Sequence, residues 1–104
     1  ERDFTYIGDV MKIINKIIFK KFKNHKIFNI CSSKPINILE ILNIFNDNNQ
    51  INVKLSKRHN ADILKTHGEN KKIKKELNFI NFTSFYSVYK KIFHWYKLNK
   101  IYKM

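Results

Sequence analysis

The sequence predicts a mixed α/β chain in which three or four amphipathic helices alternate with short strands. Apolar residues recur at helical spacing in several segments, and short β-prone runs lie between those segments. The chain also lacks repeated βαβ units and the glycine-rich turn that opens a dinucleotide-binding domain. With 104 residues it forms one domain at most, too small for a two-domain enzyme with its own cofactor fold. Because the first residue is Glu1 and no signal peptide follows it, we expect a piece of a longer protein or a processed product.

The N-terminal segment is predicted to be a strand followed by a helix. Residues 2–7 are β-prone, and Gly8 ends this run. Asp9 can then cap a helix over residues 10–18. The apolar positions of this helix form one core-facing stripe, made of Val10, Ile13, Ile14, Ile17 and Ile18.

A second strand and a second helix are predicted next. Residues 27–30 form a short apolar strand, and residues 32–35 form a loop. Asn37, with Glu40 three residues later, resembles a capping box that opens a helix. This helix ends at residues 46–49, and its apolar side consists of Ile38, Ile41, Leu42 and Phe45.

The second half of the chain is predicted to contain one strand and two helices. Residues 51–55 alternate as a third strand, and residues 56–68 are a polar, irregular loop. A short basic helix ends at Leu77, where Asn78 can take the left-handed conformation usually given to glycine. Thr83 or Ser84 caps the last helix. The apolar set of the last helix keeps helical spacing for three turns: Phe85, Val88, Tyr89, Ile92, Phe93 and Tyr96.

The strong positive charge invites a nucleic-acid interpretation. The chain has 21 basic and 8 acidic residues, a formal net charge of +13. However, 19 of the basic residues are lysines spread over the polar faces of the predicted helices, as codon bias in an AT-rich genome would produce. Trp95 and Tyr96 could stack on bases, but the helical period of their stripe favours core packing. We therefore favour solvated lysine faces and no specific nucleic-acid partner, and keep a small basic nucleic-acid-binding protein as the alternative.

The cysteine and histidine residues predict no metal or nucleophile site. Cys31 has no companion cysteine, so no internal disulfide is possible, and we expect a reducing, cytoplasmic compartment in which Cys31 is a small buried residue. His25, His67 and His94 have no partner at metal-ligand spacing. No apolar run reaches the length of a membrane span, and a basic module lying on a membrane surface is a weaker third hypothesis.

Two polar groups are candidate binding residues. Arg2 and Asp3 lie on the first predicted strand, where Arg2 can meet a phosphate through its guanidinium fork or form an exposed ion pair with Asp3. Arg58, His59 and Asp62 lie in the polar loop, where the basic side chains can meet a phosphate and Asp62 can accept hydrogen bonds from sugar hydroxyls. From pattern alone, an exposed ion pair is the favoured interpretation of the first group and a solvated polar loop that of the second.

Several segments, taken in order, resemble the C-terminal third of the extended short-chain dehydrogenase/reductases, and most of all the UDP-glucuronate 4-epimerase type. Residues 2–10, RDFTYIGDV, are similar to the family's R-D-F-x-Y-I-x-D-V. Residues 28–36, FNICSSKPI, are similar to Y-N-I-G-x-x-x-P-V, and residues 38–40 to the L-L-E that follows. Residues 62–79 keep the spacing of D-V-x-x-T-x-x-D-x-x-K-x-x-x-x-L-G-F. The end of the chain is similar to the closing T-S-L and F-V-x-W-Y in residues 83–85 and 93–96.

The resemblance implies that residues 1–104 are a truncated C-terminal substrate-binding subdomain without the Rossmann half. It implies that Arg2 lies against the nucleotide diphosphate and that Asp62 meets the ribose. The family's Arg-x-Gly-Asp would place His59 at the arginine position, with Arg58 one residue early. The family's glycines are Cys31, Ala61 and Asn78 here, and its Asp before Lys72 is Glu69.

The resemblance also implies what this chain leaves to other parts of an enzyme. In the family, the N-terminal Rossmann half binds NAD and carries the catalytic Tyr-x-x-x-Lys, which this sequence lacks. We therefore expect a UDP-sugar 4-epimerase portion, or that of a related dehydratase, with no catalytic residue and no NAD site of its own. The expected partners are the UDP-sugar and the missing Rossmann half, within a homodimeric intact enzyme that has no membrane attachment.

Overall fold

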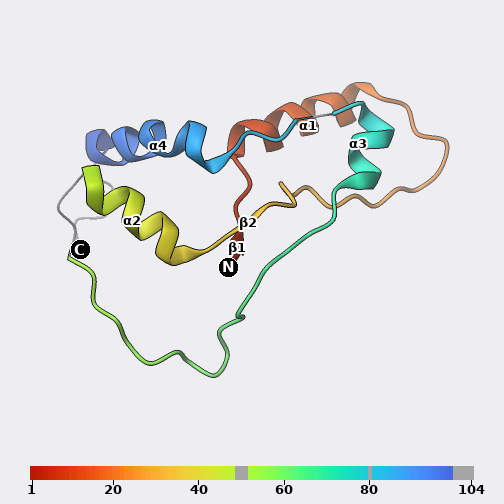
Figure 1. The fold of residues 1–104 in the computed structure, drawn as a ribbon. Helices are drawn as coiled ribbons and strands as arrows, with labels where there is room; N and C mark the ends of the chain where they lie inside the picture. The colour runs from red at the N-terminus through yellow and green to blue at the C-terminus, as the bar shows by residue number, and fades with distance from the viewer. Residues whose placement is uncertain (49–51, 80, 100–104) are drawn as a thin grey trace.

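The computed structural model describes residues 1–48, 52–79 and 81–99, which form four helices and a two-stranded sheet (Figure 1). The helices and strands follow the order β1 (Arg2–Asp3), α1 (Ile7–Phe19), β2 (Pro35–Ile36), α2 (Ile38–Asn48), α3 (Lys71–Leu77) and α4 (Phe85–Asn99). The two strands pair antiparallel, with Arg2 opposite Ile36 and Asp3 opposite Pro35. The predicted mixed, helix-rich α/β class is confirmed at this level. None of the helices in these ranges combines the length and the hydropathy needed to cross a bilayer.

The chain is much more open than a compact domain of its length. Its radius of gyration is 16.9 Å and its extents are 51 × 34 × 24 Å, whereas a compact domain of this length has a radius of about 13 Å. Its accessible surface is 8978 Å², against about 6,200 Å² for a folded monomer of this mass. Figure 1 shows the reason, because α2 and α4 lie at one end, α1 and α3 at the other, and a long loop spans the opening between them.

The end formed by α1 and α3 has a small apolar core. Ile13 of α1 and Ile73 of α3 are fully buried. The rest of this core consists of buried Leu77, Phe79 and Phe82, with the partly buried Ile17, Phe22, Phe28 and Ile30 packed against it. Because α3 has only seven residues, its stability depends on this packing.

The end formed by α2 and α4 is held by aromatic rings. The Phe45 ring of α2 lies edge-on to Tyr89, with centroids 5.9 Å apart, and 5.5 Å from Phe93. The Phe85 ring stacks on Tyr89 at 6.2 Å and lies 5.5 Å from Phe4, which precedes α1. Phe85, Tyr89 and Phe93 of α4 therefore pack on other aromatic residues, as the helical period predicted. The core packing predicted for the rest of the stripe and for Trp95 is wrong at three positions, because Ile92, Trp95 and Tyr96 are 45–54% exposed.

The start of α1 differs from the prediction. The helix begins at Ile7, with Tyr6 in the capping position, so Gly8 lies inside the first turn. Asp9 does not cap the helix; its carboxylate accepts hydrogen bonds from the Thr83 nitrogen at 2.7 Å and the Thr83 hydroxyl at 2.8 Å. Asp9 is only 2% exposed. Its role is therefore to join α1 to the segment before α4.

The predicted strands are mostly absent. The strand expected over residues 2–7 is limited to Arg2–Asp3, and its partner is Pro35–Ile36, where a loop was expected. Residues 27–30 are not a strand, because Phe28 and Ile30 pack on the α1–α3 core and no neighbouring strand pairs with them in the described chain. Residue 51 lies outside the described ranges, and residues 52–55 are exposed without secondary structure. A short extended segment needs a ladder partner to become a strand.

Three predicted helix boundaries are confirmed. The Asn37 side-chain oxygen accepts a hydrogen bond from the Leu39 nitrogen at 2.9 Å, so Asn37 caps α2. Asn78 follows α3 in the left-handed conformation, with φ of 51°. Ser84 directly precedes α4, so the predicted boundary is confirmed, but the Ser84 hydroxyl donates to the Ser87 hydroxyl at 3.3 Å, and the Ser87 nitrogen donates to the Ser84 carbonyl at 3.2 Å.

Candidate functional site

The strand that carries Arg2 is flanked on its other edge by residues 64–66. The Glu1 nitrogen donates to the Leu64 carbonyl at 3.0 Å, and the Thr66 nitrogen donates to the Glu1 carbonyl at 3.2 Å. The Asp3 nitrogen adds a bond to the Thr66 hydroxyl at 2.9 Å. The two backbone bonds have the slanted pattern of a parallel pair. The end of the polar loop therefore lies directly beside β1.

Arg2 does not form the ion pair with Asp3 that was considered from the sequence. Its guanidinium donates to the Glu1 carbonyl at 2.9 Å. Successive residues of a strand point to opposite faces, and the Asp3 carboxylate makes a separate set of bonds. The partly exposed guanidinium of Arg2 keeps further donors for a phosphate.

The Asp3 carboxylate joins three segments of the chain. It accepts a hydrogen bond from the Ser32 hydroxyl and bonds from the backbone nitrogens of Ser33 and Gly68, each at 3.1 Å. Partial burial raises the pKa of Asp3, but the hydrogen bonds from Ser32 and from backbone N–H groups outweigh burial and hold the pKa below its usual value. Asp3 is thus an ionised structural acceptor beneath the strand that carries Arg2.

Arg58, His59 and Asp62 lie in one exposed turn, as predicted for the polar loop. The Arg58 guanidinium donates to the Asp62 carbonyl at 2.8 Å, and the Asp62 carboxylate accepts a bond from the His59 nitrogen at 3.3 Å. The Asp62 nitrogen in turn donates to the His59 carbonyl at 3.0 Å. These bonds shape the turn and use only part of each side chain. Further guanidinium donors and the second carboxylate oxygen remain for a ligand.

The structure brings the two candidate groups to the same edge but does not join their side chains. Asp62 lies two residues before Leu64, whose carbonyl bonds to Glu1. The Arg2 guanidinium bonds to Glu1 and not to the turn. The two groups therefore lie in neighbouring segments, β1 and the loop that bonds to it, and the described hydrogen bonds do not join their side chains.

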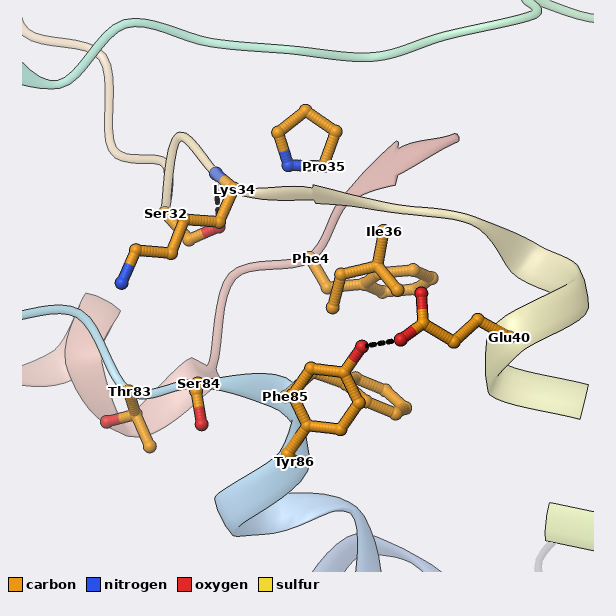
Figure 2. A pocket seen from close by; sticks show the side chains of 10 residues that line it. All are labelled: Phe4, Ser32, Lys34, Pro35, Ile36, Glu40, Thr83, Ser84, Phe85 and Tyr86. Carbon is orange, nitrogen blue, oxygen red and sulfur yellow. Dashed lines mark hydrogen bonds between the residues drawn. The ribbon is translucent and has the colours of Figure 1, made fainter. Parts of the chain in front are cut away.

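A pocket of about 220 Å³ lies beneath β2, between β2 and the start of α4 (Figure 2). Four of the segments that carry the sequence resemblance, residues 2–10, 28–36, 38–40 and 83–85, contribute to its lining, although they are up to about 80 residues apart; residues 62–79 and 93–96 do not. Its lining includes Phe4, Pro35, Ile36, Glu40, Thr83, Ser84 and Phe85. These short motifs therefore share a structural role at the junction of β1, β2, α2 and α4.

The polar groups at this junction bond mainly to one another. Figure 2 shows the Tyr86 hydroxyl of α4 pointing at the Glu40 carboxylate of α2, to which it donates a hydrogen bond. This bond, followed by partial desolvation and the charge of Glu40, raises the pKa of Tyr86 above its ordinary value. Glu40 consequently links α2 to α4 in addition to its place in the first turn of α2.

Sequence reasoning missed the polar residues that hold the 31–34 turn. The Asn70 side chain, 4% exposed, donates to the Cys31 carbonyl at 2.9 Å and to the Ser32 carbonyl at 3.1 Å. Gly68 lies so close to Cys31 that an added Cβ would be 2.5 Å from the Cys31 sulfur. The sequence signal for this close approach was Gly68 itself, an isolated glycine in a polar loop, because glycine often marks a place where another part of the chain comes near.

Cys31 is partly buried, and it does not lie on a strand. Desolvation, followed by the nearby charge of Asp3, raises the pKa of its thiol. A raised pKa disfavours the reactive thiolate. Among the described residues, no group of three histidine, cysteine or acidic side chains is placed to hold a metal ion.

Three lysines meet at the C-terminal end of α3. The ammonium groups of Lys16 and Lys20 donate to the carbonyls of Leu77 (3.4 Å) and Glu76, respectively. Lys26 forms an ion pair with the Glu76 carboxylate at 3.3 Å. Cations near the last carbonyls of a helix satisfy acceptors and oppose the negative end of the helix dipole. These lysines thus have structural partners within the chain.

Comparison with known proteins gives one weak relationship. The chain is 30% identical over 102 residues to the uncharacterized protein MJ1055 of Methanocaldococcus jannaschii. The match covers 96% of this chain and 31% of the archaeal protein, so the chain spans about a third of the relative's length. No protein-family model and no solved structure matches the chain.

Proposed function

We propose that this chain is the C-terminal substrate-binding portion of an extended short-chain dehydrogenase/reductase that acts on a UDP-sugar, as a 4-epimerase or a related dehydratase. The observation that carries the proposal is the pairing of β1 with residues 64–66 through three hydrogen bonds. This pairing brings the segment that follows the 58–62 turn beside the strand that carries Arg2. An anionic diphosphate next to a hydroxyl-bearing ribose is the kind of ligand that such a basic and acidic edge would bind.

In this proposal each candidate residue has a distinct role. Arg2 donates to the diphosphate, and Arg58 or His59 contributes a second positive or hydrogen-bonding contact. Asp62 accepts hydrogen bonds from the ribose hydroxyls, because an ionised carboxylate has only acceptors to offer. Asp3 positions the strand and does not contact the ligand.

The convergence of the similar motifs supports the same proposal. Residues from four of the similar motifs, 2–10, 28–36, 38–40 and 83–85, line the junction below β2. Sequence motifs that line the same pocket are constrained by the same packing, which explains why they keep their order and spacing along the chain. The large exposed surface of the chain is also what a subdomain completed by another domain would have.

The proposal leaves the reaction itself to a Rossmann half outside this sequence. That half would bind NAD, which accepts and returns a hydride, and would supply the catalytic tyrosine and lysine. The intact enzyme would be a cytoplasmic homodimer. The 104-residue chain alone is expected to bind the nucleotide part weakly and to show no turnover.

Titration of the isotope-labelled chain with UDP-glucuronate, followed by backbone and arginine NMR signals, tests the proposal. We expect shifts concentrated at Arg2 and at residues 58–62. Asp62→Asn should weaken binding by about tenfold, the size of one charged hydrogen bond. Asp47→Asn, an exposed carboxylate on α2, is the matched control and should change nothing.

Two results would overturn the proposal. One is the absence of any shift at Arg2 and residues 58–62 at millimolar UDP-glucuronate. The other is salt-dependent, nanomolar binding to DNA without a response to the UDP-sugar, which would favour the nucleic-acid alternative.

A further inference from the structure

The pocket beneath β2 has the size and the lining of a site for one small ring. The rings of Phe4 and Phe85, whose centroids are 5.5 Å apart, supply aromatic surface, and Pro35 and Ile36 of β2 supply aliphatic surface. Aromatic side chains of this kind pack well against another flat ring. A cavity of about 150 Å³ holds a benzene ring. The 220 Å³ of this pocket therefore leaves room for one ring with small substituents.

Most polar groups of the lining already have partners within the chain. The Thr83 nitrogen and hydroxyl both donate to a carboxylate of α1, and the Ser32 hydroxyl donates to Asp3. The Ser84 hydroxyl donates to a hydroxyl one turn further along α4. The hydroxyl donors of these three side chains are therefore already used.

Two oppositely charged side chains line the same pocket and remain apart. In residues 1–48, 52–79 and 81–99, the Lys34 ammonium group has no hydrogen-bond or ion-pair partner, and it does not pair with the Glu40 carboxylate. Figure 2 shows this ammonium group on the side of the pocket toward Thr83, and the Glu40 carboxylate on the other side, next to Tyr86. The hydrogen bond from Tyr86 leaves the second oxygen of Glu40 able to accept. The pocket thus has opposite charges at opposite ends of an apolar lining.

We propose that this pocket binds a small zwitterion in which one flat ring separates an ammonium group from a carboxylate. The carboxylate of the ligand pairs with Lys34, and its ammonium group donates to Glu40. The aromatic rings of Phe85 and Tyr86, on the Glu40 side of the pocket, add attraction for a cation. An α-amino acid does not satisfy this arrangement, because a single carbon separates its two charged groups and they cannot reach both ends.

The charges of the pocket favour a zwitterion over a ligand with one charge. An anion would pair with Lys34 but would bring like charge toward Glu40. A cation would pair with Glu40, but the chain as a whole carries a net charge of +13 and repels it. A zwitterion meets an opposite charge at each end and has no net charge.

This proposal does not depend on the UDP-sugar assignment. Neither Arg2 nor any residue of the 58–62 turn lines the pocket. Failure of the zwitterion to bind would therefore leave the nucleotide proposal intact, and the reverse also holds.

NMR titration of the isotope-labelled 104-residue chain with three related compounds tests the pocket. The zwitterion is para-(aminomethyl)benzoate; para-methylbenzoate lacks its ammonium group, and para-methylbenzylamine lacks its carboxylate. We expect the zwitterion to give saturable shifts at Lys34, Ile36 and Phe85 at millimolar concentration. We expect each single-charge compound to bind there at least about tenfold more weakly.

Two substitutions assign the ends of the ligand. Lys34→Gln should weaken binding of the zwitterion by about tenfold and leave para-methylbenzylamine unchanged. Lys90→Gln removes an exposed lysine of α4 that does not line the pocket, and it should leave binding of the zwitterion unchanged.

Glu40→Gln should have the converse effect, weakening binding of the zwitterion by about tenfold and leaving para-methylbenzoate unchanged. Asp47→Asn, an exposed carboxylate of the same helix, is its control. Unchanged helix content by circular dichroism shows that each variant is folded. The comparison of the three compounds on the unmodified chain tests the proposal without any variant.

Three outcomes would overturn the proposal. The first is the absence of saturable shifts around the pocket with about 10 mM zwitterion. The second is equal binding of the zwitterion and either single-charge compound. The third is equal weakening by a pocket substitution and by its control.

Discussion

The carboxylate of Asp9 accepts two hydrogen bonds from Thr83, one from its backbone nitrogen and one from its hydroxyl, across 74 residues of sequence. Asp9 lies in the first turn of α1, and Thr83 lies in the connecting segment shortly before α4. The bond pair is nearly shielded from water. It therefore fixes the relative position of the two ends of the molecule, which share little apolar core.

Replacement of Asp9 by asparagine is expected to loosen this junction. The amide offers one neutral acceptor and one NH2 group in place of two charged acceptors, so the Thr83 nitrogen and hydroxyl lose their charge-assisted bonds, and the hydroxyl must turn to accept from the NH2 group. The cost is about 1–3 kcal/mol. The hydrogen-exchange rate of the Thr83 amide measures this loss of stability. Thr83→Ser, which keeps the backbone and the hydroxyl donors, is the control. Equal protection of the amide in Asp9→Asn and the unmodified chain would contradict this prediction.

The Asp3 junction is expected to weaken in acid. Because the folded pKa of Asp3 lies below its ordinary value of 3.8, the ionised form stabilises the fold above the unfolded pKa. This stabilisation is lost as the pH falls through the lower, folded pKa. Exchange of the Ser33 and Gly68 amides, measured from pH 6 downward, should accelerate in that acid range. Asp3→Asn should remove this pH dependence, and its persistence in the variant would assign the effect to another group.

The Tyr86–Glu40 pair is expected to weaken in alkali. The folded pKa of Tyr86 lies above its ordinary value of 10.0. Its contribution is therefore complete below the unfolded pKa and is lost as the pH rises through the folded pKa. Absorbance titration of the phenols, with Tyr86→Phe to identify the signal, should show the Tyr86 pKa falling toward 10.0 in Glu40→Gln. Glu76→Gln, which removes a carboxylate at the other end of the molecule, should leave it unchanged.

The isolated chain is expected to be expanded and to bind an apolar dye. Its separated ends give a radius of gyration of 16.9 Å, compared with about 13 Å for a compact domain, and many large apolar side chains are exposed. Small-angle scattering should report the larger value, and anilinonaphthalene sulfonate should fluoresce with the chain. A radius near the compact value, without dye fluorescence, would show that the chain closes on itself.

The sequence was most informative where a local rule determines the structure. The helical period of α4, the Asn37 cap and the left-handed Asn78 each depend on neighbouring residues, and each is confirmed. Strands depend on distant partners, so residues 27–30 could not be assigned from their β-prone composition. The same reason explains the missed roles of Asp3 and Asp9, whose hydrogen-bond donors lie between 29 and 74 residues away. The candidate turn at residues 58–62 was found, whereas its alignment with β1 required the structure.

The lysines at the end of α3 limit how freely this basic chain can change. A helix of seven residues cannot persist without outside support, and Lys16, Lys20 and Lys26 provide that support from another segment. A neutral replacement of Lys16 or Lys20 that lacks an N–H group would leave the carbonyls of Leu77 and Glu76 without these donors and loosen the last turn of α3, which the packing of Ile73 and Leu77 still holds against α1. Part of the positive charge of this chain is therefore tied to the end of one short helix and does not serve as solvated surface alone.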